Sequence, residues 1–262
     1  MVQAVSKKNN IVGKKDSNES WSVVDRELIE YNSRQYMEMY RSTSFVISNL
    51  SKKIKTNESL NILDIGCGGG GNLFHIAKKF DNCNFTGVDI NEYFINFAKK
   101  NYNAMGVKNV NFYECDIFSS KESVFSNKKN QKYDIVGSSQ VLSFLDYDRA
   151  KEIVHKYFQT ASKAVYFQSL FTDYKLDYQI NIFDFTYNKV VPYNVYCISE
   201  LEKTASLYNF QLTIKKEFVI DIDIDLCNNS LGRKTMKDEH GKRMMFTGDL
   251  YLPWHFLYFE KV

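Results

Sequence analysis

Short apolar runs alternate with amphipathic segments along the chain from about residue 60 onward. Apolar runs of strand length occupy 60–66, 84–90, 109–118, 133–140 and 163–170. Between these runs, apolar positions recur at helical spacing over 71–80, 92–106 and 142–161. This rhythm predicts an α/β fold in which helices cover both faces of a parallel sheet.

The alternation breaks after residue 170. Residues 171–196 are dense in Phe and Tyr, which predicts an aromatic-rich insertion after the fifth strand. A helix is expected over 199–209, followed by two long strands over 210–226 and 250–261. The interval 226–249 between those strands predicts a second insertion.

Two stretches precede the predicted sheet. Residues 1–20 carry charge without an apolar core segment, so we expect a mobile tail and no signal peptide. Residues 21–58 predict one or two helices ahead of a main domain over 59–262. Apolar side chains recur there at helical spacing, at Leu28, Ile29, Tyr36, Met37 and Tyr40. They allow two interpretations: a helix packed on the sheet, or a helical lid whose tyrosines also line a pocket.

Composition and charge narrow the class of partner. The 262 residues are 44% hydrophobic and 25% charged, with a formal net charge of +3. Arginines are few and unclustered, which argues against a nucleic-acid partner. The apolar runs are too short to span a bilayer, so we expect no stable membrane association. Five scattered cysteines without metal-ligand spacing favour reduced thiols, a cytoplasmic location and no bound metal.

The chemistry is concentrated where the first strand meets the first helix, in "DIGCGGGGN" at 64–72. Gly66, Gly68 and Gly71 satisfy the G-x-G-x-x-G pattern of dinucleotide sites. Asp64 argues against a dinucleotide, because a carboxylate beside a pyrophosphate at a helix N-terminus adds repulsion between like charges. S-adenosylmethionine (SAM) has no phosphate and carries an ammonium and a sulfonium, which this acid would attract.

Two further acids follow the next two strands. Asp89 ends the second strand, where a carboxylate can accept hydrogen bonds from both hydroxyls of a ribose. Asp116 follows the third strand, where it can accept from an adenine amino group while Ile90 and Ile117 sandwich the ring. An acid at each of three successive strand ends is a more specific pattern than the glycines.

These segments resemble the class I SAM-dependent methyltransferases. The resemblance rests on "LDIGCGGG", "VDIN", "ECDIF" and "YDIVGSSQVLSFL" and covers about residues 60–170. It implies a Rossmann-like seven-stranded sheet of order 3-2-1-4-5-7-6 with strand 7 antiparallel. It also implies SAM as cofactor and S-adenosylhomocysteine as product. The expected cofactor residues are Asp64, Gly66, Cys67, Gly68, Gly70, Asn72, Asp89, Ile90, Asp116, Ile117, Ser138, Ser139 and Gln140.

No sequence motif identifies the methyl acceptor. Methyl transfer mainly needs alignment of the acceptor and exclusion of water, so small molecules are the expected class, methylated on O or N. We expect the helical lid and the two insertions to build the acceptor pocket. Candidate substrate contacts are Tyr36, Tyr40, Tyr178 and Arg243, and candidate general bases are His240 and His255.

The C-terminal segment 232–261 is loosely similar to predicted methyltransferases of bacterial surface-polysaccharide gene clusters. That similarity suggests a sugar- or phosphate-containing precursor as acceptor. Three alternatives stay open: a lipid or quinone acceptor, a SAM-binding partner protein without turnover, and a nicotinamide oxidoreductase. We expect a monomer or a homodimer.

Overall fold

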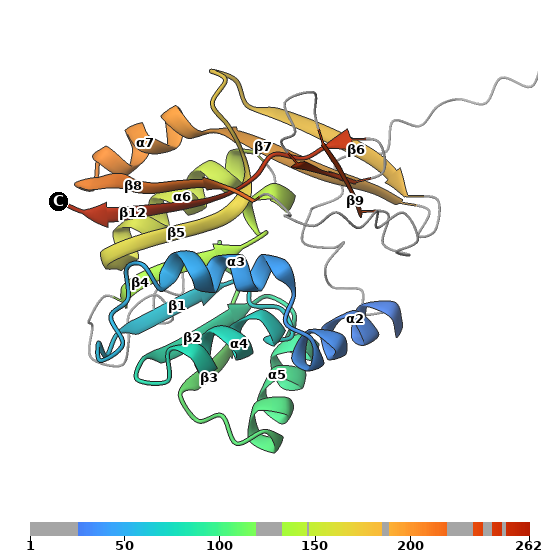
Figure 1. Ribbon diagram of the computed structural model, residues 1–262, viewed down its shortest axis with the longest axis vertical. Coiled ribbons are helices and arrows are strands. Elements are labelled where there is room, and N and C mark those ends of the chain that lie inside the picture. The colour runs from blue at the N-terminus through green and yellow to red at the C-terminus, as the bar shows by residue number, and fades with distance from the viewer. Residues whose placement is uncertain are drawn as a thin grey trace, which may run out of the picture.

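A mixed β-sheet runs through the protein in the computed structural model, which describes residues 26–118, 133–145, 147–184, 189–218, 233–237, 243–247 and 250–262. Its main path has the order β3-β2-β1-β4-β5-β12-β8 (Figure 1). The strands are β1 (Asn61–Ile65), β2 (Asn84–Asp89), β3 (Val110–Glu114), β4 (Tyr133–Ser139), β5 (Ala161–Thr172), β8 (Phe210–Glu217) and β12 (Trp254–Lys261). With β8 and β12 as the sixth and seventh strands of the core, the expected order 3-2-1-4-5-7-6 is confirmed. The expected count of seven is wrong, because two strands of the aromatic insertion join the same sheet through β5 and make it nine-stranded.

Strand directions also follow the expectation. The pairs from β3 to β5 are all parallel, whereas β12 is antiparallel to both β5 and β8. Since parallel strands end at the same edge of a sheet, the carboxyl ends of β1, β2, β3, β4 and β5 meet there. This edge carries the acids and glycines singled out above.

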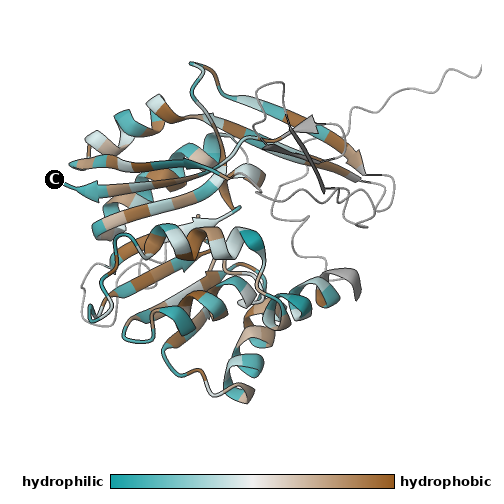
Figure 2. Cartoon of the chain, in the orientation of Figure 1, coloured by the Kyte–Doolittle hydropathy of each residue, from teal (hydrophilic) through white to brown (hydrophobic). Residues whose placement is uncertain are grey.

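Two helix layers cover the sheet. On one face lie α3 (Arg41–Leu50), α4 (Gly71–Lys79) and α5 (Glu92–Ala104), which share a buried cluster with Tyr166. On the other lie α6 (Tyr147–Thr160) and α7 (Ile198–Ser206), which share a cluster with Phe167 (Figure 1). The adjacent residues Tyr166 and Phe167 face opposite sides because side chains alternate along a strand. Figure 2 shows the hydrophobic positions concentrated in the strands and in the helix faces turned toward them.

Helix α2 (Arg26–Met37) buries Tyr36, one of the expected apolar positions, together with the polar side chains of Asn32 and Gln35, which were not expected to be buried. Met37 is 80% exposed, whereas Asn32, Gln35 and Tyr36 are at most 7% exposed. The expectation for Met37 is therefore wrong, because α2 packs the side that carries Asn32 and Tyr36 against the glycine loop. The predicted tail over 1–20 lies outside the described residues.

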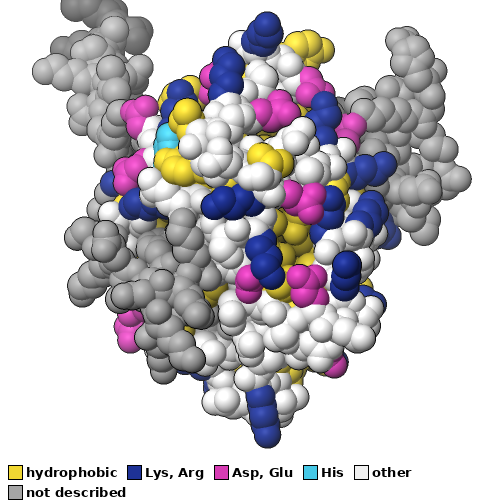
Figure 3. All heavy atoms as spheres, turned by 90° about the vertical axis from the view of Figure 1, so that its left-hand side faces the viewer, with side chains coloured by type: hydrophobic (Ala, Val, Ile, Leu, Met, Phe, Trp, Pro, Cys, Tyr) yellow, Lys and Arg dark blue, Asp and Glu magenta, His cyan; other side chains and the backbone are white. Residues whose placement is uncertain are grey.

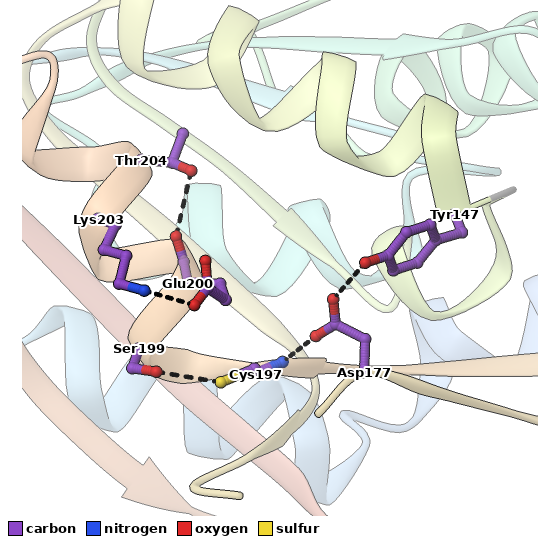
Figure 4. Close-up of polar contacts among 7 residues, drawn as sticks. All are labelled: Tyr147, Asp177, Cys197, Ser199, Glu200, Lys203 and Thr204. Carbon is purple, nitrogen blue, oxygen red and sulfur yellow. Dashed lines mark hydrogen bonds and ion pairs between the residues drawn. The ribbon is translucent and has the colours of Figure 1, made fainter. Parts of the chain in front are cut away.

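The aromatic insertion is a β-hairpin of β6 (Tyr178–Asp184) and β7 (Lys189–Cys197). Asp177, just before β6, connects the start of the hairpin to helices α6 and α7 through two hydrogen bonds (Figure 4). The Tyr147 hydroxyl on α6 donates to Asp177 Oδ2 at 2.7 Å, and the Cys197 N–H, at the start of α7, donates to Oδ1 at 2.5 Å. These two hydrogen bonds hold the end of the hairpin that is nearest the main sheet.

The region after β8 departs in part from the expected pair of long strands. Strand β8 ends at Glu217, and residues 219–232 lie outside the described part of the chain. Three strands, β9 (Arg233–Lys237), β10 (Arg243–Thr247) and β11 (Leu250–Tyr251), form a separate antiparallel sheet. The expected single strand over 250–261 is thus divided into β11 and β12. No helix among the described residues is long and apolar enough to cross a membrane.

Candidate functional site

The glycine loop joins β1 to α4 at the carboxyl edge of the sheet. The N–H groups of Gly66 and Cys67 both donate to the Val88 carbonyl, at 2.8 and 3.0 Å, which turns the chain sharply after β1. Gly66 has φ +71°, and a Cβ built there would lie 2.3 Å from Val141 Cγ2. A side chain is excluded at this position by both conformation and space.

Asp64 is a buried carboxylate at the end of β1, only 6% exposed. Its neighbours across the sheet are Gly87 on β2 and Gly137 on β4. No described residue donates a hydrogen bond to its carboxylate. Burial, with a smaller contribution from the charge of Asp89, raises the pKa of Asp64 to about 7. A buried and unpaired carboxylate fits a ligand that brings positive charge to the loop.

Asp89 links the glycine loop to the end of β2. Its Oδ2 accepts from the Gly68 N–H at 2.8 Å and its Oδ1 accepts from the Asn91 N–H at 2.9 Å. Burial raises the pKa of Asp89, against these backbone hydrogen bonds, which lower it. Burial and the two acids also raise the pKa of the Cys67 thiol, so the thiol stays protonated within the loop.

The third acid lies beyond the end of β3. Asp116 Oδ1 accepts from the Phe118 N–H at 2.9 Å, which shapes the turn after the strand. Ile117 is half-buried against the core, whereas Ile90 is 37% exposed. Asp64, Asp89 and Asp116 therefore stand at the ends of three neighbouring strands, as expected from the sequence.

The end of β4 lies next to the row of acids formed by Asp64, Asp89 and Asp116, because β4 pairs with β1. Ser138 is buried, and Ser139 and Gln140 are half-buried. Gln140 has φ +67°, and its N–H donates to the Gln168 carbonyl on β5 at 2.6 Å. A left-handed conformation at a residue with a side chain stores strain and is often found at functional sites.

Helices α2 and α3 hold the glycine loop through hydrogen bonds. The Tyr36 hydroxyl donates to the Gly69 carbonyl, and the Gly69 N–H donates to Asn32 Oδ1 at 3.1 Å. The Thr43 hydroxyl on α3 donates to Asn72 Oδ1 at 2.5 Å. Asn32 was missed from the sequence, although Asn32 and Gln35 lie at helical spacing and on the same side of the helix as the expected Tyr36. The 5% exposure of Tyr36 favours a supporting role over the expected substrate contact.

Three other candidates can be placed in the fold. His255 is on β12, with β4 and β5 between it and β1, and its Nδ1 contacts the Pro253 carbonyl at 2.9 Å. Tyr40 packs edge-on against Tyr31, with ring centroids 5.6 Å apart. Tyr178 begins β6 and is 37% exposed. The roles of these three side chains as base or substrate contacts stay predictions.

Two candidates cannot be placed in the site. His240 lies outside the described residues. Arg243 begins β10, where the described structure gives its place in the strand and not its side chain. Among the described residues, no group of three His, Cys, Asp or Glu side chains gathers as a metal site would require.

A hollow of about 400 Å³ lies at the opposite edge of the sheet (Figure 3). Leu60, Ile135 and Tyr258 contribute to its apolar surface, and lysines and glutamates surround it. The charged groups pair with one another, as in the ion pair of Lys53 with Glu260 at 2.5 Å. The hollow adjoins the start of β1, whereas the glycine loop follows the end of β1. The hollow is therefore not part of the candidate site.

Comparison with known proteins agrees with this geometry. Residues 56–219, more than half of the chain, match the family model described as "Methyltransferase domain". The chain is 32% identical over 97 residues to the release factor glutamine methyltransferase of Fusobacterium nucleatum, covering 37% of this chain and 26% of that protein. It is 28% identical over 117 residues to the malonyl-[acyl-carrier protein] O-methyltransferase of Bacillus anthracis, covering 45% and 39%. The chain thus matches well under half the length of either relative.

A solved structure extends the likeness to nearly the whole fold. The magnesium protoporphyrin IX methyltransferase of Synechocystis PCC 6803, crystallised with bound SAM, superposes with a TM-score of 0.54 at 14% identity. The alignment covers 92% of this chain and 86% of that one. The family match, the strand order and the row of acids show that the chain belongs to the class I SAM-dependent methyltransferases.

Proposed function

We propose that the protein transfers the methyl group of SAM to an oxygen or nitrogen of a small polar metabolite. One observation supports this most directly: Asp64 is a buried carboxylate to which no described residue donates a hydrogen bond. SAM brings an ammonium and a sulfonium, and either charge offsets the cost of burying this acid. A pyrophosphate would instead increase that cost, which argues against a nicotinamide cofactor.

Each acid at a strand end is proposed to bind a different part of SAM. When bound, SAM supplies an activated methyl group, so the protein has to bind, orient and exclude water. Asp64 holds the charged amino-acid end, Asp89 accepts from the ribose hydroxyls, and Asp116 accepts from the adenine amino group. The glycine loop admits the cofactor against its backbone. Helices α2 and α3 fix the loop through Tyr36, Asn32 and Thr43.

A polar acceptor is favoured by the side chains beside this row. The carboxyl ends of β4 and β5 and the turn after β4 hold four polar residues that are at most 1% exposed: Ser138, Ser143, Gln168 and Ser169. Ser143 and Ser169 are already hydrogen-bonded to each other, whereas the side-chain oxygen of Gln168 is buried without a partner among the described residues. This unpaired oxygen suits an acceptor with a hydrogen-bonding group, because a buried polar atom costs free energy unless it is paired. It does not suit the lipid or quinone of the alternative proposal.

The relatives leave the acceptor open, because the names of the two matched methyltransferases specify a release factor and an acyl-carrier protein. Within polar metabolites, a sugar- or phosphate-containing precursor of a bacterial surface polysaccharide is our specific candidate. It rests on the similarity of residues 232–261 alone. We place the reaction in the cytoplasm.

The test is transfer of label from methyl-labelled SAM into an extract of cells that make the protein. The extract is then separated into small polar, organic-soluble and macromolecular fractions. Label in the small polar fraction is expected and identifies the acceptor. Label only in another fraction would overturn the acceptor class and leave the cofactor assignment standing. Binding of SAM without transfer to any fraction would favour a non-catalytic partner protein.

A further inference from the structure

Gln168 on β5 has an unpaired polar atom in the interior. The side chain is 1% exposed, and its Oε1 is buried without a hydrogen-bond partner among the described residues. A buried acceptor atom without a donor is uncommon in folded proteins and costs stability. Gln179 shows the usual situation, since its amide donates to Asn194 Oδ1 at 2.8 Å.

The place of Gln168 in the sheet indicates what could supply the donor. It pairs with Ser139 on β4 and with Phe256 on β12, so these three residues share a face. Phe256 belongs to the core cluster under α3, where Phe45 packs against it with ring centroids 6.3 Å apart. Gln168 therefore points toward the face of the sheet that α3 and the glycine loop occupy.

The order of the strands relates Gln168 to the cofactor. Asp64 and Asp89 lie at the ends of β1 and β2, and Asp116 follows β3. The proposed function places the amino-acid end, the ribose and the adenine at these three strands in turn. The same row continues through β4 to Gln168 on β5. Neighbouring strands are about 4.8 Å apart, so β5 is roughly 10 Å from β1. Asp64, Gly137 and Tyr166 are in register across β1, β4 and β5, so Gln168, two residues after Tyr166, lies on the same face of the sheet as Asp64.

We propose that Gln168 Oε1 accepts a hydrogen bond from the methyl acceptor and so selects acceptors that carry an O–H or N–H group. This inference rests on the proposed function and makes its acceptor class narrower. Gln168 is neutral and does not act as a base; it orients the nucleophilic group through its proton. An ionised carboxylate has no proton to donate, so the site discriminates against acids as acceptors.

The test compares Gln168→Met with a matched control, Gln159→Met. Methionine has a similar size and no acceptor oxygen of comparable strength. Gln159 is exposed on α6, and its amide donates to the Tyr208 hydroxyl at 3.2 Å. For each variant, three quantities are measured: the melting temperature without cofactor, the affinity for S-adenosylhomocysteine, and the rate of label transfer from SAM at several concentrations of cell extract.

The inference predicts a specific combination of results for Gln168→Met. Its melting temperature should equal or exceed that of the wild type, because an unpaired buried atom has been removed. Affinity for S-adenosylhomocysteine should stay unchanged, and label transfer should fall at least about tenfold at low extract concentration. Gln159→Met should transfer label at the wild-type rate.

Other results would overturn the inference. Wild-type transfer by Gln168→Met would show that no acceptor contact exists, and a lower melting temperature would show that Gln168 is a structural residue. The comparison is made in whichever fraction the wild type labels, so an error in the proposed acceptor class is detected separately. If the wild type labels no fraction, the proposed function and this inference fail together.

Discussion

The backbone N–H of Gly68 donates a hydrogen bond of 2.8 Å to the carboxylate of Asp89, which ties the glycine loop to the end of β2. The acid proposed to hold the ribose therefore also fixes the loop proposed to hold the amino-acid end. Substitution at one position should affect both parts of the cofactor site, and this connection leads to the first prediction.

Asp89→Ala should weaken SAM binding by about 1–3 kcal/mol, the usual cost of leaving bound polar groups unpaired. The loss has two sources, the ribose hydroxyls and the unpaired Gly68 N–H. Isothermal titration calorimetry measures it, and Asp173→Ala is the control. Asp173 forms an exposed ion pair with Lys215 at 2.8 Å, and its loss should leave affinity unchanged. Unchanged affinity in Asp89→Ala would show that the ribose lies elsewhere.

The raised pKa of Asp64 predicts that SAM binding depends on pH. With a pKa of about 7, the ionised form of Asp64 becomes more abundant as pH rises from 5.5 to 7.5. The positively charged cofactor prefers the ionised carboxylate, so affinity should rise roughly tenfold across this window. An α-amino group begins to lose its proton near the upper end of this window, which opposes the rise, so a variant without the carboxylate is the necessary comparison. Asp64→Asn should bind SAM more weakly and without this rise; an equal rise in the variant would assign it to another group.

The same pKa predicts the opposite trend for stability without cofactor. The pKa of Asp64 is higher in the folded chain, at about 7, than its ordinary value of 3.8. Between these values the folded state binds more protons, so the free energy of unfolding should fall as pH rises from about 4 to 7. Asp64→Asn should lack this contribution and be more stable than the wild type at pH 8, by on the order of a few kcal/mol. Chemical denaturation at pH 5 and pH 8 measures the difference; a wild type at least as stable as the variant at pH 8 would contradict it.

Two glycines with similar backbone angles provide a matched test of the glycine loop. Gly66 and Gly106 have φ +71° and +70°, but a Cβ at Gly106 would have nothing within 4 Å. Gly106→Ala should therefore cost only conformational strain, about 1 kcal/mol. Gly66→Ala adds the clash with Val141 and should cost about 1–3 kcal/mol more. Thermal unfolding measures both, and Val141→Ala combined with Gly66→Ala should recover part of the loss. Equal costs at the two glycines would mean that the loop adjusts freely.

The sheet and the cofactor row could be predicted because each rests on a local pattern. Apolar runs identified the strands, and a strand ending in an acid placed Asp64, Asp89 and Asp116. The role of α2 could be predicted only in part from apolar spacing: Tyr36 is buried as expected, but Asn32 and Gln35 are buried beside it and Met37 is exposed. The buried face follows from a tertiary contact: Asn32 and Tyr36 bind backbone groups of the glycine loop. Gln168 was missed for a similar reason, because an amide in an apolar strand gives no local sign that its oxygen is unpaired.

The position of β12 in the sheet has a consequence for synthesis of the chain. Among the described strands, β8 pairs only with β12, which lies between β5 and β8. A ribosome releases β5 and β8 before β12, so both strands emerge without the partner that later separates them. Meanwhile β1 to β4 already contain the acids and glycines of the cofactor site and can pair with one another. We therefore expect the nascent chain to expose an unpaired β8 and the edge of β5 that β12 later covers, where contacts between chains can begin, until Trp254–Lys261 emerges.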